Sequence, residues 1–157
     1  MQTNKKFTIL ITTKNRKDDL AFTLRKIQYL LDRDDVACII CDDGSTDETC
    51  FFIKESYPNI QFIQNAKSEG LIYSRNRMMA LVTTEFAISI DDDLHFITQN
   101  PLEIMEKAFL ENPKVGLFSF RIFWSLNEPQ ITKCNEAAHA VQSFAGGANV
   151  WRMSAWN

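Results

Sequence analysis

The sequence predicts an α/β fold in which a mostly parallel central sheet is flanked by helices. Short runs of β-branched and aromatic residues alternate with segments of helical periodicity, which is typical of βαβ units. Apolar residues make up 45% of the 157 residues, enough to fill the core of one domain. Polar residues gather where the predicted strands end, which is the edge at which parallel sheets bind ligands. We therefore expect a single domain over residues 1–157.

The predicted elements follow one another in a regular order. Apolar runs predict strands at 7–11, 36–41, 60–63, 86–90 and 115–123. Periodicity and helix-start signals predict helices over 17–31, from 45–48 onward, over 72–82 and over 100–112. The second helix rests on a capping box, Ser45-Thr46-Asp47-Glu48. The segment from Phe144 to Val150 reads as a glycine-rich turn that enters a further strand.

Charge and hydropathy argue against several classes of protein. The chain has 17 basic and 20 acidic residues with no basic stripe, which argues against a nucleic-acid partner. No segment approaches the roughly 18 consecutive apolar residues that span a bilayer. Because the stretch from Met1 to Lys6 is polar, we do not expect it to be a secretory signal. We therefore expect a cytoplasmic protein.

The cysteines favour a structural role. Cys38 and Cys41 have the spacing of a zinc knuckle, but no second pair follows. Both lie in a predicted strand, where residues three apart point to opposite faces. Buried, reduced thiols are the expectation.

Three consecutive carboxylates, Asp91-Asp92-Asp93, follow the predicted strand at 86–90. Magnesium and manganese prefer such oxygen ligands and take one or two carboxylates together with substrate phosphates. Alternation along an extended chain places Asp91 and Asp93 on one side, for a metal, and Asp92 on the other, where it anchors the loop to an arginine. The alternative is a solvated acidic turn that caps the next helix.

Other polar residues carry two interpretations each. In Asp42-Asp43-Gly44-Ser45, a turn and helix cap explain the glycine and the serine, whereas the second aspartate suits a nucleobase N–H. Arg75 and Arg77 suit anionic groups or a solvated helix face, and spacing favours the solvated face for Arg77. His95 is a metal ligand or a packed or exposed side chain. Core or acceptor-cleft positions are expected for the three tryptophans, Trp124, Trp151 and Trp156.

Taken together, these residues resemble the family 2 glycosyltransferases of the Rossmann-like GT-A fold. The resemblance spans Thr8 to Arg152 and rests on five pieces in the expected order: 11–16 (Ile-Thr-Thr-Lys-Asn-Arg), 42–47 (Asp-Asp-Gly-Ser-Thr-Asp), 70–76 with Arg75-Asn76, the acidic triplet, and 146–149 (Gly-Gly-Ala-Asn).

The resemblance implies a nucleotide-sugar donor, usually a UDP-sugar. Thr12 and Asp43 would contact the base, and Arg75 would lie beside it or brace the acidic loop. Asp91 or Asp92 would face the ribose.

The first and last aspartates of the triplet match the Asp-X-Asp motif of the family. The resemblance therefore implies that Asp93, with Asp91, holds a Mn²⁺ or Mg²⁺ ion that bridges the two phosphates. It also implies a saccharide or lipid-linked acceptor, peripheral membrane association and a role in cell-surface polysaccharide synthesis.

Family members continue to a Glu-Asp pair that supplies the catalytic base of inverting enzymes, and no such pair follows Gly146-Gly147 here. We expect a nucleotide-sugar-binding domain that lacks the acceptor and base region. Two alternatives are a catalytically incomplete nucleotide-binding module and a sugar nucleotidyltransferase. The latter normally has a glycine-rich phosphate loop after its first strand, and residues 12–16 contain no glycine.

Overall fold

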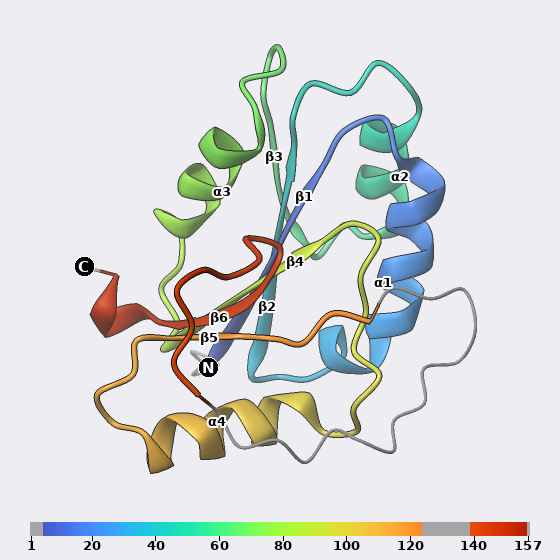
Figure 1. Ribbon diagram of the computed structural model, residues 1–157. Coiled ribbons are helices and arrows are strands. Elements are labelled where there is room, and N and C mark those ends of the chain that lie inside the picture. The colour runs from blue at the N-terminus through green and yellow to red at the C-terminus, as the bar shows by residue number, and fades with distance from the viewer. Residues whose placement is uncertain (1–4, 124–138, 157) are drawn as a thin grey trace.

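A six-stranded sheet forms the centre of the molecule in the computed structural model, which describes residues 5–123 and 139–156 (Figure 1). Its strand order is β3-β2-β1-β4-β6-β5. The strands are β1 (Phe7–Thr13), β2 (Val36–Asp42), β3 (Gln61–Gln64), β4 (Phe86–Asp91), β5 (Leu117–Ser119) and β6 (Ala148–Arg152). The first four strands run parallel, whereas β6 is antiparallel to both β4 and β5. The predicted α/β fold with a mostly parallel sheet is confirmed.

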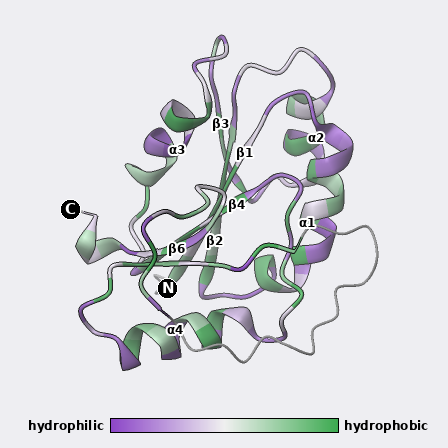
Figure 2. Cartoon of the chain, viewed as in Figure 1, coloured by the Kyte–Doolittle hydropathy of each residue, from purple (hydrophilic) through white to green (hydrophobic). Residues whose placement is uncertain are grey.

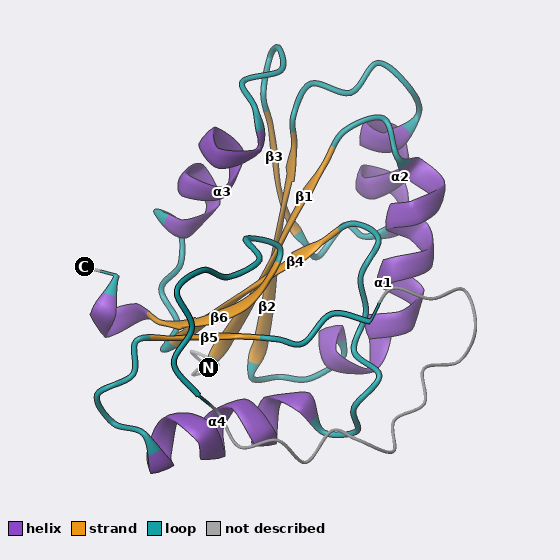
Figure 3. Ribbon diagram, in the orientation of Figure 1, coloured by secondary structure: helices purple, strands orange, loops and turns teal. Residues whose placement is uncertain are grey.

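Helices cover both faces of this sheet (Figure 3). They are α1 (Lys17–Leu31), α2 (Thr49–Ser56), α3 (Leu71–Met79) and α4 (Pro101–Glu111), and a short 3₁₀ helix, η2 (Met153–Ala155), follows β6. Buried side chains of α1, α2 and α4 pack in one core cluster with Phe7, Ile9 and Ile11. Those of α3 pack on the opposite face with Leu10 and Ile39.

Alternation along the strands explains the two cores. Successive residues of β1 point to opposite faces, and all seven are buried because helices cover both faces. The central strands are accordingly coloured mainly as hydrophobic in Figure 2, whereas α1 shows both colours. Leu20, Leu24 and Ile27 form the buried stripe of α1. Phe109 of α4 closes one end of the core by stacking on Phe86 at 5.0 Å.

The expected capping box at residues 45–48 is wrong. Helix α2 begins at Thr49, and its cap residue Glu48 makes no side-chain cap bond. The hydroxyl of Ser45 donates to Asp42 instead, and the carboxylate of Asp47 accepts the backbone N–H of Thr49 at 2.9 Å. An aspartate nearer to the helix therefore satisfies the first backbone donor, which displaces the predicted start.

Two other elements are shorter than predicted. Helix α3 ends at Met79, where Met78 and Met79 are buried, and Leu81 lies beyond the helix and is exposed. The strand expected at 115–123 extends only over residues 117–119, where β5 pairs with β6 and forms one edge of the sheet. The glycine-rich turn before β6 and the helix start at Pro101 are as predicted, although Asn100 makes no side-chain cap bond.

Cys38 and Cys41 are buried free thiols that belong to opposite core clusters, as predicted. Burial raises the pKa of Cys38 to about 12, so this thiol is protonated at neutral pH. Among the helices within residues 5–123 and 139–156, none combines the length and the apolar character required to cross a bilayer.

Candidate functional site: the carboxyl edge of the sheet

The strand order reverses between β1 and β4, and the polar residues meet at that point. The chain moves outward from β1 to β2 and β3, and then returns to place β4 on the other side of β1. Such a reversal opens a crevice at the carboxyl ends of the strands, where α/β proteins bind ligands. In the strand register, Thr12 lies opposite Asp91 on β4 and Thr13 lies opposite Asp42 on β2. Residues far apart in the sequence thus share one edge.

Thr12 and Thr13 face different sides of the sheet. Thr12 alternates with Leu10 and so lies on the α3 face, and its buried hydroxyl has no hydrogen-bond partner among the described residues. Thr13 lies on the α1 face, where its hydroxyl donates to Asp92 Oδ2 at 2.8 Å. A buried hydroxyl without a partner is unfavourable. Thr12 therefore has hydrogen-bonding capacity that a ligand at this edge would use.

On the α3 side, Asp91 is paired with Arg75. The Arg75 guanidinium, which comes from α3, donates to Asp91 Oδ1, and 43% of the Asp91 side chain remains exposed. Two glycines lie against this ion pair. A Cβ at Gly146 would fall 2.5 Å from the nearest Arg75 nitrogen, and one at Gly147 would fall 2.0 Å from Asp91 Oδ1. The turn before β6 can approach the pair this closely only because both residues are glycines.

Asp92 is the buried anchor of the acidic turn, as predicted. It accepts the Thr13 hydrogen bond, and Arg16 lies 3.4 Å from its Oδ1. The hydroxyl of Thr23, on α1, donates to the Asp92 backbone carbonyl at 2.9 Å. Burial raises the pKa of the Asp92 carboxyl, while the Thr13 hydrogen bond and the nearby guanidinium act in the opposite direction. The side chain fixes the turn and has little surface to offer a ligand.

Asp93 departs from the predicted arrangement. Alternation was expected to put it beside Asp91, but β4 ends at Asp91 and the next two residues form a turn. Arg16 contacts Asp93 Oδ2 at 3.0 Å, and 48% of the Asp93 side chain is exposed. Asp91 is therefore paired from the α3 side by Arg75, and Asp93 from the α1 side by Arg16. Two arginines of the chain thus neutralise part of the charge of the acidic triplet.

The donor set still fits a hard divalent ion. Asp91 and Asp93 are half-exposed carboxylates, the ligand type that magnesium and manganese prefer. Within the described ranges, no group of three or more histidine, cysteine or acidic side chains could hold a metal by itself. Such a site would rely on one or two carboxylates completed by substrate phosphates, which is the usual arrangement for magnesium.

Asp43 is the most heavily hydrogen-bonded carboxylate of the site. Its oxygens accept from the side chains of Asn65, Ser68 and Ser74 and from the backbone N–H groups of Glu69 and Gly70. Burial alone would raise the pKa of Asp43, but these donors hold it well below its usual range. A carboxylate offers about four acceptor positions. Asp43 therefore fixes the loop between β3 and α3, and a base could reach it only by replacing one of these donors.

Asn15 joins the loops after β1 and β2. Its backbone has φ 53°, a left-handed conformation that asparagine tolerates better than most residues. The Asn15 side-chain carbonyl accepts from Thr46 N at 2.7 Å, and its backbone N–H donates to Ser45 Oγ at 2.8 Å. Gly44 has φ 76° and packs on the backbone of Lys67 so closely that a Cβ would fall 2.8 Å from it. These contacts hold the strand ends together.

The remaining residues considered in the sequence analysis lie around this edge. Arg77 is exposed, but it is more than a solvated side chain, because it donates to Asn65 Oδ1 at 2.6 Å. His95 packs edge-on against Phe22 at 5.7 Å. Trp151 and Trp156 contact each other at 5.3 Å beside η2. Trp124 lies outside the described residues.

Arg16 is the residue that the sequence analysis listed without giving it a role. It contacts Asp19, Asp92 and Asp93. The expectation that Asp92 meets an arginine pointed to such a residue. Only the fold shows which arginine it is, because residues 16 and 92 are brought together by the parallel pairing of β1 and β4.

Comparison with known proteins identifies the family. Residues 8–152 match the model of glycosyl transferase family 2. The chain belongs to glycosyl transferase family 2. No curated protein sequence matches it.

Solved structures share the fold of this family 2 chain. A mannosyltransferase from Pyrobaculum calidifontis, PcManGT, in complex with GDP-Man and Mn²⁺, is 24% identical over 73% of this chain and 34% of its own, with a TM-score of 0.63. S. aureus TarS 1–349 in complex with UDP-GlcNAc is 18% identical over 95% of this chain and 46% of its own, with a TM-score of 0.72. The family 2 chain thus spans between a third and a half of the length of these proteins.

Proposed function

We propose that this domain binds the nucleotide-sugar donor of a glycosyltransferase, with a UDP-sugar as the substrate class. The observation that carries the proposal is the pairing of Thr12 with Asp91 across β1 and β4. A buried hydroxyl without a partner and a half-exposed carboxylate lie side by side there, at the strand-order reversal of a family 2 fold. This is the place and the chemistry that a nucleotide needs.

In the proposed complex, the base and ribose lie on the α3 side of the edge. The Thr12 hydroxyl gains a partner from the base, and Asp91 accepts from the ribose, as does Asp92 if the turn opens. Arg75 braces Asp91 beside the base. Asp43 reaches the base by releasing Ser68, which is exposed and so bonds readily to solvent instead. The other donors to Asp43 include the buried side chains of Asn65 and Ser74 and stay in place.

The diphosphate lies over the acidic turn in this proposal. Asp93, with Asp91, holds a Mn²⁺ or Mg²⁺ ion, which when bound offsets the charge that develops on the leaving phosphates. The hydroxyl oxygen of a saccharide or lipid-linked acceptor forms a bond to the anomeric carbon with inversion, as the bond between that carbon and the nucleoside diphosphate breaks. The base that deprotonates this hydroxyl is not assigned to any residue of the chain. A cytoplasmic location with peripheral contact to a membrane, and a product in cell-surface polysaccharide, complete the proposal.

A second function is nucleotide binding without turnover. Both functions require the donor site. They differ in whether a UDP-sugar is hydrolysed or transferred by the folded chain. A sugar nucleotidyltransferase is disfavoured by the family match.

Thr12→Val tests the base site with a matched control. Valine has nearly the shape of threonine, so replacing a hydroxyl that has no partner leaves stability close to that of the wild type. UDP affinity is expected to fall by about tenfold, the value of one buried hydrogen bond. Thr49→Val removes another buried hydroxyl without a partner, at the start of α2 and outside the Thr12–Asp91 pair, and should leave UDP binding unchanged. Calorimetric titration of UDP and of GDP into the three proteins measures both affinity and base preference. Equal UDP affinity in Thr12→Val and wild type would remove Thr12 from the site.

A further inference from the structure

Arg16 occupies a place where it must interact with any metal bound by the acidic turn. Its guanidinium lies 3.0 Å from Asp93 Oδ2 and 3.4 Å from Asp92 Oδ1. Asp93 is also the residue to which the proposed function assigns the divalent ion. A guanidinium and a divalent cation at one exposed carboxylate repel each other. One of the two must give way when the other is bound.

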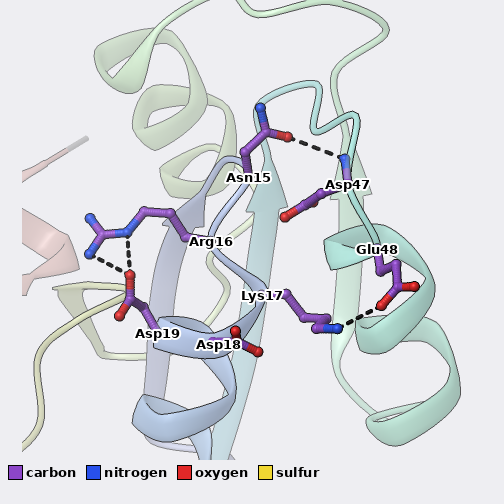
Figure 4. Close-up of a pocket in the computed structure, with 7 residues that line it drawn as sticks. All are labelled: Asn15, Arg16, Lys17, Asp18, Asp19, Asp47 and Glu48. Atoms are coloured by element: carbon purple, nitrogen blue, oxygen red, sulfur yellow. Dashed lines mark hydrogen bonds and ion pairs between the residues drawn. The ribbon is translucent and has the colours of Figure 1, made fainter.

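A second carboxylate allows Arg16 to move without losing its charge partner. Arg16 Nε also donates to Asp19 Oδ2 at 2.9 Å, one turn into α1 (Figure 4). Asp19 and Arg16 are both half exposed, so this pair exchanges readily with solvent. Arg16 can therefore release Asp93 and keep its contacts with Asp19 and Asp92.

The acidic turn does not depend on Arg16 for its conformation. The Thr13 hydroxyl holds the Asp92 side chain, and the Thr23 hydroxyl holds the Asp92 backbone carbonyl. Both threonines are buried and come from β1 and α1, whereas Arg16 is exposed. Replacement of Arg16 should therefore leave the turn in place and remove only the positive charge beside Asp93.

We propose that Arg16 is a resident counter-ion of the metal site, which pairs with Asp93 in the metal-free protein and competes with the divalent ion for it. This inference rests on the proposed function, because it assumes that Asp93 is a metal ligand. Arg16 is a positioning residue in this role. It keeps the charge of Asp93 neutralised, and it sets the free metal concentration at which the site fills.

The direction in which Arg16→Gln changes the affinity for Mn²⁺ separates this role from a purely structural one. If Arg16 competes with the ion, Arg16→Gln tightens Mn²⁺ binding, by about tenfold for loss of a charge next to a divalent ion in an exposed site. If Arg16 only holds the turn together, the same change loosens the ligand and weakens binding. Arg16→Lys keeps the charge and is expected to bind Mn²⁺ much as the wild type does.

The experiment is a titration of Mn²⁺ without nucleotide, with free Mn²⁺ followed by electron paramagnetic resonance. The variants are Arg16→Gln, Arg16→Lys and the matched control Arg33→Gln, which removes another arginine that pairs with two carboxylates, Asp35 and Glu103. The expected result is an increase in affinity for Arg16→Gln alone. Unchanged or weaker Mn²⁺ binding by Arg16→Gln overturns the inference.

Two variants distinguish an error in the role of Arg16 from an error in the proposed metal site. A parallel titration of Mn²⁺ with saturating UDP compares wild type with Asp93→Ala. If Asp93→Ala binds Mn²⁺ and UDP as the wild type does, the proposed metal site is wrong and the role of Arg16 falls with it. If Asp93→Ala abolishes this binding while Arg16→Gln leaves metal affinity unchanged, the site stands and only the competition is refuted.

Discussion

Gly147 lies directly against the carboxylate of Asp91. A Cβ added at Gly147 would fall 2.0 to 2.1 Å from all three carboxyl atoms of that side chain. Arg75 holds the same carboxylate from the other side. Asp91 is thus held between the turn before β6 and helix α3. Its position depends on the absence of a side chain at Gly147.

Gly147→Ala is therefore expected to displace Asp91 from Arg75. The loss of a charge-assisted contact at the nucleotide site should weaken UDP binding by at least about tenfold. Gly146→Ala is the graded control, because its Cβ meets only the end of the flexible Arg75 side chain. Calorimetry on both variants measures the difference. UDP affinity in Gly147→Ala equal to that of the wild type would show that the placement of Asp91 does not matter for binding.

Asp43→Asn is expected to destabilise the fold by about 2 kcal/mol, because a buried amide cannot accept all the hydrogen bonds that the carboxylate accepts. Urea unfolding at neutral pH gives the free energy of unfolding. Asp34→Asn, at an exposed aspartate, provides the control. A loss no larger than that of the control would mean that the donors around Asp43 are satisfied without it.

The effect of Asp43 on stability should depend on pH. Its pKa is lowered in the folded protein, so its contribution is complete above the unfolded value of about 4 and is lost as the pH falls below that value. The difference in unfolding free energy between wild type and Asp43→Asn should shrink as the pH is lowered from 6 to about 2. A difference that stays constant over this range would contradict the ionised, hydrogen-bonded carboxylate seen here.

Cysteine labelling tests the buried thiols. Burial raises the pKa of Cys38 and of Cys41, whereas Cys50 is partly exposed. At pH 8, a thiol reagent should modify Cys50 in the native protein, and Cys38 and Cys41 only after unfolding. Peptide mapping by mass spectrometry assigns the modified residues. Rapid labelling of Cys38 without denaturant would contradict its position in the core.

The sequence predicts the sheet well because the strands are short, apolar and separated by clear helical patterns. The apolar runs from Val36 to Cys41 and from Phe86 to Ile90 predict buried strands, and both form such strands in the structure. Local competition among side chains is harder to predict. Ser45 and Asp47 are both suitable residues to cap helix α2. The Ser45 hydroxyl is already bonded to Asn15 and Asp42, so Asp47 accepts the backbone N–H of the helix instead.

The sequence predicts which residues lie at the carboxyl edge of the sheet. It does not predict which of their side chains pair with one another. The acidic triplet, Thr12 and Asp43 were placed at one edge by the rule that parallel strands end together. The alternation of side chains along β4 does not extend to Asp93, because the strand ends two residues earlier, at Asp91. The partners of Asp43 and the pairing of Arg16 with Asp93 join distant parts of the chain, and their geometry follows only from the packed fold.

The central claim is that Asp93 supports metal-dependent binding of UDP at the carboxyl edge of the sheet. The most direct test is a calorimetric titration of UDP with and without Mn²⁺ into wild type, Asp93→Ala and the exposed control Asp34→Ala. We expect UDP binding to wild type and the control to require Mn²⁺ and to be abolished by Asp93→Ala. Binding of UDP by folded Asp93→Ala with the affinity and manganese dependence of the wild type would contradict the claim.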